Sequence, residues 1–133
     1  MQDKPAAIRL AVLPGVYAVC RLDRHADLPG WAMKQAFCSV TRTADELSIV
    51  CAAGDVPDGV VCETGWRMLK LEGPFDFSLV GILLAVLQPL AEAGVSIFAL
   101  STYDTDYVLV HEAQLNQAVA ALAARGHQVT ANG

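Results

Sequence analysis

The sequence has no long uninterrupted apolar run, although 54% of its 133 residues are hydrophobic. The longest apolar stretch, Leu79 to Ala91, contains Gly81, Gln88 and Pro89 and is far shorter than the roughly 20 residues that span a bilayer. We therefore expect no transmembrane helix and no membrane partner. The opening Met-Gln-Asp-Lys-Pro lacks the basic and apolar regions of a secretory signal, so we expect a cytoplasmic protein.

Basic residues are also scarce. Nine Lys and Arg stand against fourteen Asp and Glu, which gives a net charge of −5, and the basic residues are scattered along the chain. A nucleic-acid-binding surface needs basic side chains gathered where they can neutralise phosphates. The composition therefore argues against nucleic acid as a partner.

The four cysteines include no Cys-x-x-Cys pair, and no histidine is spaced to complete a zinc site. We expect no metal and four reduced thiols in the core, because free cysteine packs as a small hydrophobe. The sequence also lacks a Gly-x-Ser-x-Gly elbow, a phosphate loop, a dinucleotide fingerprint and a His-Glu-x-x-His pair. Asp45 and Glu46 are adjacent carboxylates, but they fall in an expected surface turn. We therefore predict no catalytic residues and no cofactor.

The second half of the chain is the easier to interpret. Apolar residues recur every three or four positions from Ser78 to Ala93, which is typical of a core-facing helix that Asp76 or Ser78 can cap. Gly81 and Pro89 would each weaken such a helix, by roughly 1 and 3 kcal/mol relative to Ala. We expect Pro89 to have a structural role only. Gly81 has two possible roles, which are to let a ligand approach the helix backbone closely or to allow tight packing of the helix. The other elements expected here are strands at 66–72, 96–101, 106–110 and 127–130 and a helix at 112–125.

The first half is rich in strand signals and poor in helix signals. Only Leu28 to Gln35 could be helical, and the Gly, Asp and Pro residues of 52–59 predict a loop. The expected strands are 8–13, 16–22, 37–42 and 46–51. We therefore predict an α+β protein in which a β-rich half, residues 1–63, precedes a βαββαβ half, residues 64–133.

Two segments resemble the amino-acid-binding ACT domains, of the kind found in the cytosolic arginine sensor of animals and in short bacterial stand-alone proteins. They are 66–78, from Trp-Arg-Met-Leu-Lys-Leu-Glu-Gly-Pro to Phe-Asp-Phe-Ser, and 96–110, which contains Ser-Thr-Tyr-Asp-Thr-Asp. The segment 39–51 with Val56-Pro57 also looks like the N-terminal half of the bacterial proteins. The resemblance implies a ferredoxin-like ACT unit at 64–133, a shortened ACT-like half before it, and assembly through sheet edges or helices.

The resemblance implies a ligand amino acid between the start of the first helix and the hairpin loop. Unpaired N–H groups at a helix start suit a carboxylate, and the hairpin carboxylates suit an ammonium group. The resemblance places Asp106 where the arginine sensor holds its ligand's amino group, with Thr102 and Tyr103 lining the same loop. From the residues alone, the hairpin side chains could instead serve only the turn. The candidate ligand-binding residues are Asp76, Phe77, Ser78, Leu79, Val80, Ser101, Thr102, Tyr103, Asp104 and Asp106.

We therefore expect a non-catalytic sensor that binds a free amino acid and changes its own assembly or the activity of a partner protein. The alternative is a ligand-free structural module that uses the same fold for oligomerisation. A small enzyme of ferredoxin-like fold is a third possibility, because fold alone never decides function. We also predict a homodimer or larger even assembly, because the sheet edges must be paired or protected.

Overall fold

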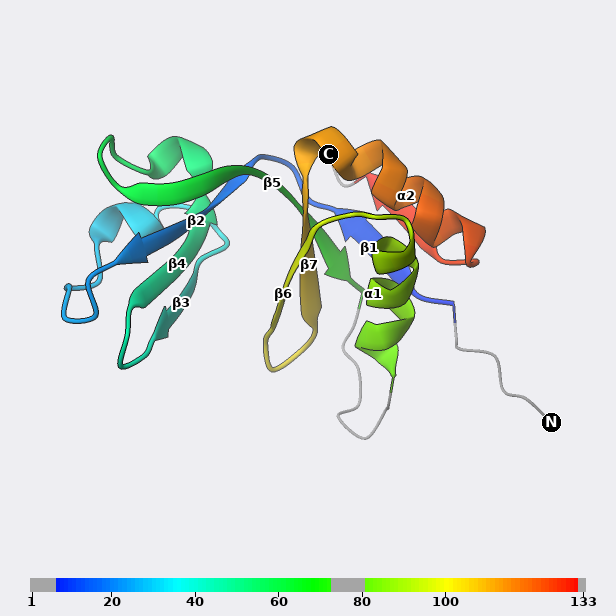
Figure 1. Ribbon diagram of the computed structural model, residues 1–133, viewed down its shortest axis with the longest axis horizontal. Helices are drawn as coiled ribbons and strands as arrows, with labels where there is room; N and C mark the ends of the chain where they lie inside the picture. Colours follow the sequence, from blue (N-terminus) through cyan, green and yellow to red (C-terminus); the bar gives the residue numbers. More distant parts are fainter. Residues whose placement is uncertain (1–6, 73–80, 132–133) are drawn as a thin grey trace. The chain divides into compact units, whose positions relative to one another are not determined.

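The computed structural model describes residues 7–72 and 81–131. By its internal contacts the chain divides into two compact units (Figure 1). Unit 1 combines residues 1–14 with 67–133, and unit 2 comprises residues 15–66. The strand β5 (Val61–Leu71) contributes to the sheets of both units, because its first residues pair in unit 2 and its last residues pair in unit 1.

Unit 1 contains the predicted βαββαβ order, which is confirmed as β5-α1-β6-β7-α2-β8. Its strands lie side by side in the order β6-β7-β5-β1-β8. The 3-10 turn η3 (Glu112–Gln114) precedes α2, so the helix itself starts three residues later than the predicted Glu112. The further bounds are β1 (Arg9–Val12), α1 (Ile82–Glu92), β6 (Ile97–Ser101), β7 (Asp106–His111), α2 (Leu115–Ala124) and β8 (Gln128–Ala131).

The first strand of the chain belongs to unit 1, which corrects its assignment to the first half. β1 lies between β5 and β8, antiparallel to the former and parallel to the latter. Its central residue Leu10 stands opposite both Leu71 and Val129 and is fully buried in the unit 1 core. The alternating pattern of a strand shows that one face is buried, but it does not show which neighbouring strands complete the sheet.

The core of unit 1 consists mainly of large aliphatic side chains from the sheet and the two helices. Figure 1 shows α1 and α2 beside the strands of unit 1. The large side chains that the helices bury fully in this core are Val86 and Leu90 of α1 and Leu122 of α2. The remaining members of this core are Ile8, Leu10, Leu69, Leu71, Val95, Val108, Val110 and Ala118.

Helix α1 begins later than the predicted Ser78. Its N-cap is Gly81, whose φ of 84° is left-handed, so the backbone cannot continue as a helix through this residue. Gly81 therefore lies at the N-terminus of the helix and not in its interior. Glycine adopts a positive φ readily, so it does not weaken the helix at this position. The expected capping residues Asp76 and Ser78 lie outside the described residues.

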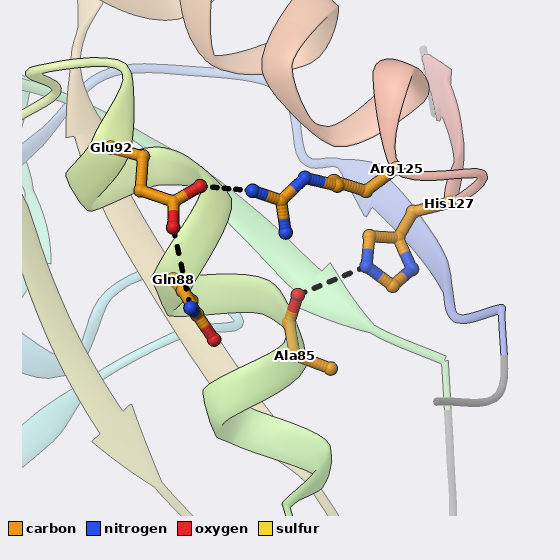
Figure 2. A network of polar contacts seen from close by, with 5 residues as sticks. All are labelled: Ala85, Gln88, Glu92, Arg125 and His127. Atoms are coloured by element: carbon orange, nitrogen blue, oxygen red, sulfur yellow. Dashed lines mark hydrogen bonds and ion pairs between the residues drawn. The ribbon is translucent and has the colours of Figure 1, made fainter. Parts of the chain in front are cut away.

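Pro89 lies inside α1 and is buried, and a histidine compensates for the amide hydrogen that it lacks. Proline cannot donate to the carbonyl four residues earlier, which here belongs to Ala85. The Nε2 atom of His127 instead lies 3.0 Å from this carbonyl oxygen (Figure 2). Its Nδ1 accepts the Ile8 amide at 3.1 Å, so Nε2 carries the proton and donates to Ala85. His127 directly precedes β8 and thereby connects α1 to Ile8, the residue before β1.

Polar side chains also join the C-terminal end of α1 to the α2 region. Gln114 donates to the Gly94 carbonyl at 3.2 Å and accepts the Ser96 amide at 3.1 Å. Glu92 forms an ion pair with Arg125 and accepts from Gln88, as Figure 2 shows. This ion pair is half-exposed, so it adds at most about 1 kcal/mol.

Unit 2 is a β-rich half, as predicted. Its strands β2 (Tyr17–Leu22), β3 (Ser39–Arg42), β4 (Leu47–Ala52) and the first part of β5 lie in the order β3-β4-β2-β5, and each strand is antiparallel to its neighbours. The register of β2 against β5 shifts between Tyr17 and Val19. Gly65 lies in β5 at this shift with a φ of 89°, which is typical of a bulge.

The core of unit 2 is made mainly of small side chains. Its buried members are Ala18, Cys20, Ala32, Leu47, Ile49 and Cys51. The predicted helix at 28–35 is only the 3-10 turn η1 (Gly30–Met33), and the loop predicted at 52–59 contains the short 3-10 turn η2 (Ala53–Asp55). In the described parts of the chain, no helix is long and apolar enough to cross a membrane.

Candidate ligand site

The loop of the β6–β7 hairpin is closed by two threonines. The Thr102 amide donates to the Thr105 carbonyl at 2.8 Å, and the Thr102 hydroxyl donates to the same oxygen at 3.1 Å. In return, the Thr105 amide donates to the Thr102 hydroxyl at 3.3 Å. Thr102 therefore has a structural role in the turn, in addition to its predicted role beside a ligand.

Thr105 also fixes the hairpin loop against the end of β5. Its hydroxyl donates to the Leu71 carbonyl at 2.7 Å, and the residue is only 6% exposed. Leu71 is the last residue of β5, so the loop lies beside the point where that strand ends. Thr105 is not among the predicted site residues, because a threonine between Asp104 and Asp106 carries no signal of burial.

Ser101 and Asp106 are brought together, as the hairpin prediction requires. They stand directly opposite each other on β6 and β7, and the Ser101 hydroxyl donates to Oδ1 of Asp106. This hydrogen bond orients the carboxylate, whose two oxygens together can accept about four hydrogen bonds. The half-buried Asp106 therefore retains acceptor capacity for a charged donor such as an ammonium group.

Tyr103 and Asp104 form the exposed tip of the loop. The Tyr103 side chain is 83% exposed, and Asp104 is exposed as well. The tip thus presents one aromatic ring and one carboxylate to solvent, two residues from Asp106. The hairpin members of the predicted site consequently form one polar cluster at the end of the β6–β7 hairpin.

The other half of the predicted site lies outside the described residues. This applies to Asp76, Phe77, Ser78, Leu79 and Val80. The first described residues of that region are Gly81 and the start of α1 at Ile82. Because glycine has no side chain to cap the helix, the first N–H groups of α1 depend on other acceptors.

An open pocket in unit 1 was not predicted from the sequence. Its volume is about 460 Å³, and its lining is mostly apolar. Arg67 is the one charged residue in this lining; its Nη2 donates to the Leu13 carbonyl at 3.4 Å, and its buried Nε has no partner among the described residues. An alternating strand pattern gives no sign that an arginine will lie beneath a helix. The other lining residues are Val12, Leu115, Asn116, Val119, Ala120, Val129, Thr130 and Ala131.

Within the described ranges 7–72 and 81–131, no group of three or more His, Cys, Asp or Glu side chains is arranged to hold a metal ion. The candidate ligand site among the described residues is the polar hairpin, and the apolar pocket with one guanidinium is a separate feature.

The βαββαβ order and the helix-covered sheet define an α+β domain of the ferredoxin-like class. Residues 61–124 match the family model described as the ACT domain, so this part of the chain is an ACT domain. A second family model, described as an N-terminal domain, matches residues 15–59. These residues fall within unit 2.

Three relatives illustrate the similarity. A protein of Agobacterium tumefaciens with a crystal structure is 40% identical, covers 97% of this chain and 96% of its own, and superposes with a TM-score of 0.92. The regulatory subunit of aspartate kinase from Thermus flavus shares the fold alone, at 10% identity, with 93% and 99% of the two chains covered and a TM-score of 0.60. The bovine cytosolic arginine sensor for mTORC1 subunit 1 is 37% identical over an alignment of 68 residues. That alignment covers 47% of this chain and 21% of the bovine protein. The match thus spans about a fifth of the length of this curated relative.

Proposed function

We propose that the protein is a non-catalytic amino-acid sensor that binds its ligand at the β6–β7 hairpin. The observation that supports this most is the pairing of Ser101 with Asp106, which orients a half-buried carboxylate at the end of the hairpin. An oriented carboxylate suits an ammonium group, the feature that all free amino acids share. The name of the bovine relative, an arginine sensor, agrees with this ligand class.

In this proposal, the ligand's carboxylate lies near the start of α1. The helix macrodipole and the N–H groups of its first turn favour an anion there. The loop is held beside the end of β5 through Thr105 and Leu71, and residues 73–80 connect β5 to α1 in sequence. The proposed site therefore joins Asp106, Ser101, Thr102, Tyr103 and Asp104 to the expected helix-start residues.

The ligand acts in this proposal by changing how the protein assembles or which partner protein it meets. The strands β6 and β8 end the unit 1 strand order, and edge strands offer unpaired backbone groups to a second chain. We propose a homodimer in the cytoplasm as the assembled form. Light scattering at tens of micromolar protein checks this part, and a monomer with and without ligand would contradict it.

A ligand-free oligomerisation module remains the second candidate. One observation favours it, because Thr102 and Thr105 close the hairpin loop through their own hydrogen bonds. A loop that already satisfies its polar groups needs no ligand to become ordered. The two candidates differ in a single measurable property, namely stabilisation by a free amino acid.

A thermal-shift screen against the twenty amino acids tests the proposed function. A ligand at about one hundred times its dissociation constant stabilises the folded state by about 2.7 kcal/mol. We expect at least one amino acid to raise the melting temperature by several degrees, while its decarboxylated amine and its deaminated acid do not. A flat screen would support the oligomerisation module instead.

A further inference from the structure

Three of the four cysteines lie on neighbouring strands of unit 2. Cys51 is on β4, Cys20 is on β2 and Cys62 is on β5. Cys20 stands directly opposite Cys62 on one side and opposite Ile49 on the other, so Cys51 is its diagonal neighbour. Because directly opposite residues point to the same face of a sheet, the Cys20 and Cys62 side chains lie together.

The thiols of this group differ in their access to solvent. Cys20 and Cys51 are each 1% exposed, whereas Cys62 is exposed, which corrects the expectation that all four cysteines are core residues. Both Cys51 and Cys62 lie close enough to the Cys20 thiol to add to the rise in its pKa that burial causes. A solvent-borne reagent therefore meets Cys62 first, and Cys20 lies next to it.

The register decides which two sulfurs can be joined. Directly opposite residues of an antiparallel pair have Cα atoms about 4.5 to 5.5 Å apart, within the roughly 4.4 to 6.8 Å that a disulfide requires. Diagonal residues are about 7 to 8 Å apart, beyond that range. Cys20 can thus be joined to Cys62 without backbone movement, whereas joining it to Cys51 would require such movement.

We propose that Cys20 and Cys62 form an oxidant-sensitive dithiol, which a hydroperoxide converts into a disulfide between β2 and β5. The Cys62 thiolate attacks one peroxide oxygen, so that an S–O bond forms and the O–O bond breaks. The departing oxygen leaves as an alcohol or as water, with the proton that Cys62 gave up, and Cys62 becomes a sulfenic acid.

The second step closes the disulfide. The Cys20 sulfur attacks the sulfenic sulfur of Cys62, the S–S bond forms and the S–O bond breaks. The hydroxide leaves as water with the Cys20 proton. The two thiols together lose two electrons, which the hydroperoxide gains, and a thiol reductant reverses the change.

The buried partner is suited to the second step and not to the first. Burial raises the pKa of Cys20 to about 12, so this thiol keeps its proton at neutral pH and does not react with an oxidant on its own. Once Cys62 is oxidised, the fixed position of the neighbouring thiol offsets its low reactivity. We expect slow, selective formation of one bond.

Thiol counting under denaturing conditions after brief peroxide treatment of the folded protein tests this proposal. The count should fall from four to two, peptide mapping should find Cys20 linked to Cys62, and reduction should restore all thiols. The melting temperature of the oxidised protein should be higher by several degrees, because the bond closes a long segment of the unfolded chain.

Two matched variants make the test specific. In Cys62→Ser the thiol count should not fall, whereas in Cys38→Ser, which removes a half-buried cysteine outside the pair, it should fall by two as in the parent. A Cys20–Cys51 bond, a disulfide between two chains through Cys62, or an unchanged thiol count in the parent would each overturn the proposal.

Discussion

The two units build their cores from different materials. The unit 1 core contains five fully buried leucines: Leu10, Leu69 and Leu71 from the sheet, Leu90 from α1 and Leu122 from α2. Four of the six buried members of the unit 2 core are alanine or cysteine. Unit 2 also has no α-helix within residues 15–66, all of which the structure describes.

This difference shows how side-chain size goes together with architecture. Large aliphatic side chains fill the space between a sheet and a helix, whereas small ones let a short turn such as η1 approach the strands closely. The same difference separates the proposed functions. The helix-covered unit carries the polar hairpin, and the unit with the small-residue core brings thiols together on neighbouring strands.

The largest expected effect is a cavity in the unit 1 core. Leu122→Ala should lower the free energy of unfolding by about 2 to 5 kcal/mol, because a fully buried leucine loses its contacts and the site relaxes only partly. In unit 2, Cys20→Ala removes a single buried sulfur and should cost much less. Urea denaturation of both variants measures the contrast, and equal losses would contradict this account of the two cores.

Alkaline pH should act on unit 2 through its buried thiols. Burial raises the pKa of Cys20 from 9.0 to about 12 in the folded state. The associated stability is therefore fully present below pH 9 and is lost as the pH rises toward 12, because the unfolded chain releases the proton first. Unfolding free energies measured from pH 8 to 11 should fall, and the fall should be smaller in Cys20→Ala. An identical pH profile for the two proteins would contradict this assignment.

A smaller effect is expected from the histidine that serves Pro89. His127→Ala should cost about 1 to 3 kcal/mol, because the buried Ile8 amide and the part-buried Ala85 carbonyl lose their partner. Pro89→Ala restores an amide that can donate to Ala85. The His127→Ala loss should therefore be smaller in a Pro89→Ala background, and a double-mutant cycle by urea denaturation checks this. Strict additivity would show that the two residues act independently.

Much of unit 1 could be predicted because its signals are local. Apolar periodicity indicates the first helix, and the helix expected at 112–125 contains α2. The position of β1 in the sheet of unit 1 could not be predicted, because it depends on pairing with β5 and β8, which lie far along the chain. The predicted start of α1 was wrong, because the spacing of apolar residues carries no information about the left-handed φ of Gly81.

The site could be predicted only where sequence neighbours meet. Ser101 and Asp106 lie across one hairpin, so a loop of four residues was enough to bring them together. The bond from Thr105 to Leu71, the arginine in the pocket and the juxtaposed cysteines all depend on register between distant strands or on helix placement. No spacing along the chain encodes these contacts.

The hairpin carboxylate is the group on which the proposed sensor function depends most. Calorimetric titration of Asp106→Asn with the best amino acid from the screen tests it, and Asp45→Asn is the matched control because it removes the same charge from an exposed turn outside the proposed site. Loss of a charged partner should cost about 2 to 5 kcal/mol of binding, or roughly thirty-fold to several-thousand-fold in affinity. We predict this loss in Asp106→Asn, with near-parental affinity in Asp45→Asn and unchanged folding in both. Parental affinity in Asp106→Asn would contradict the account.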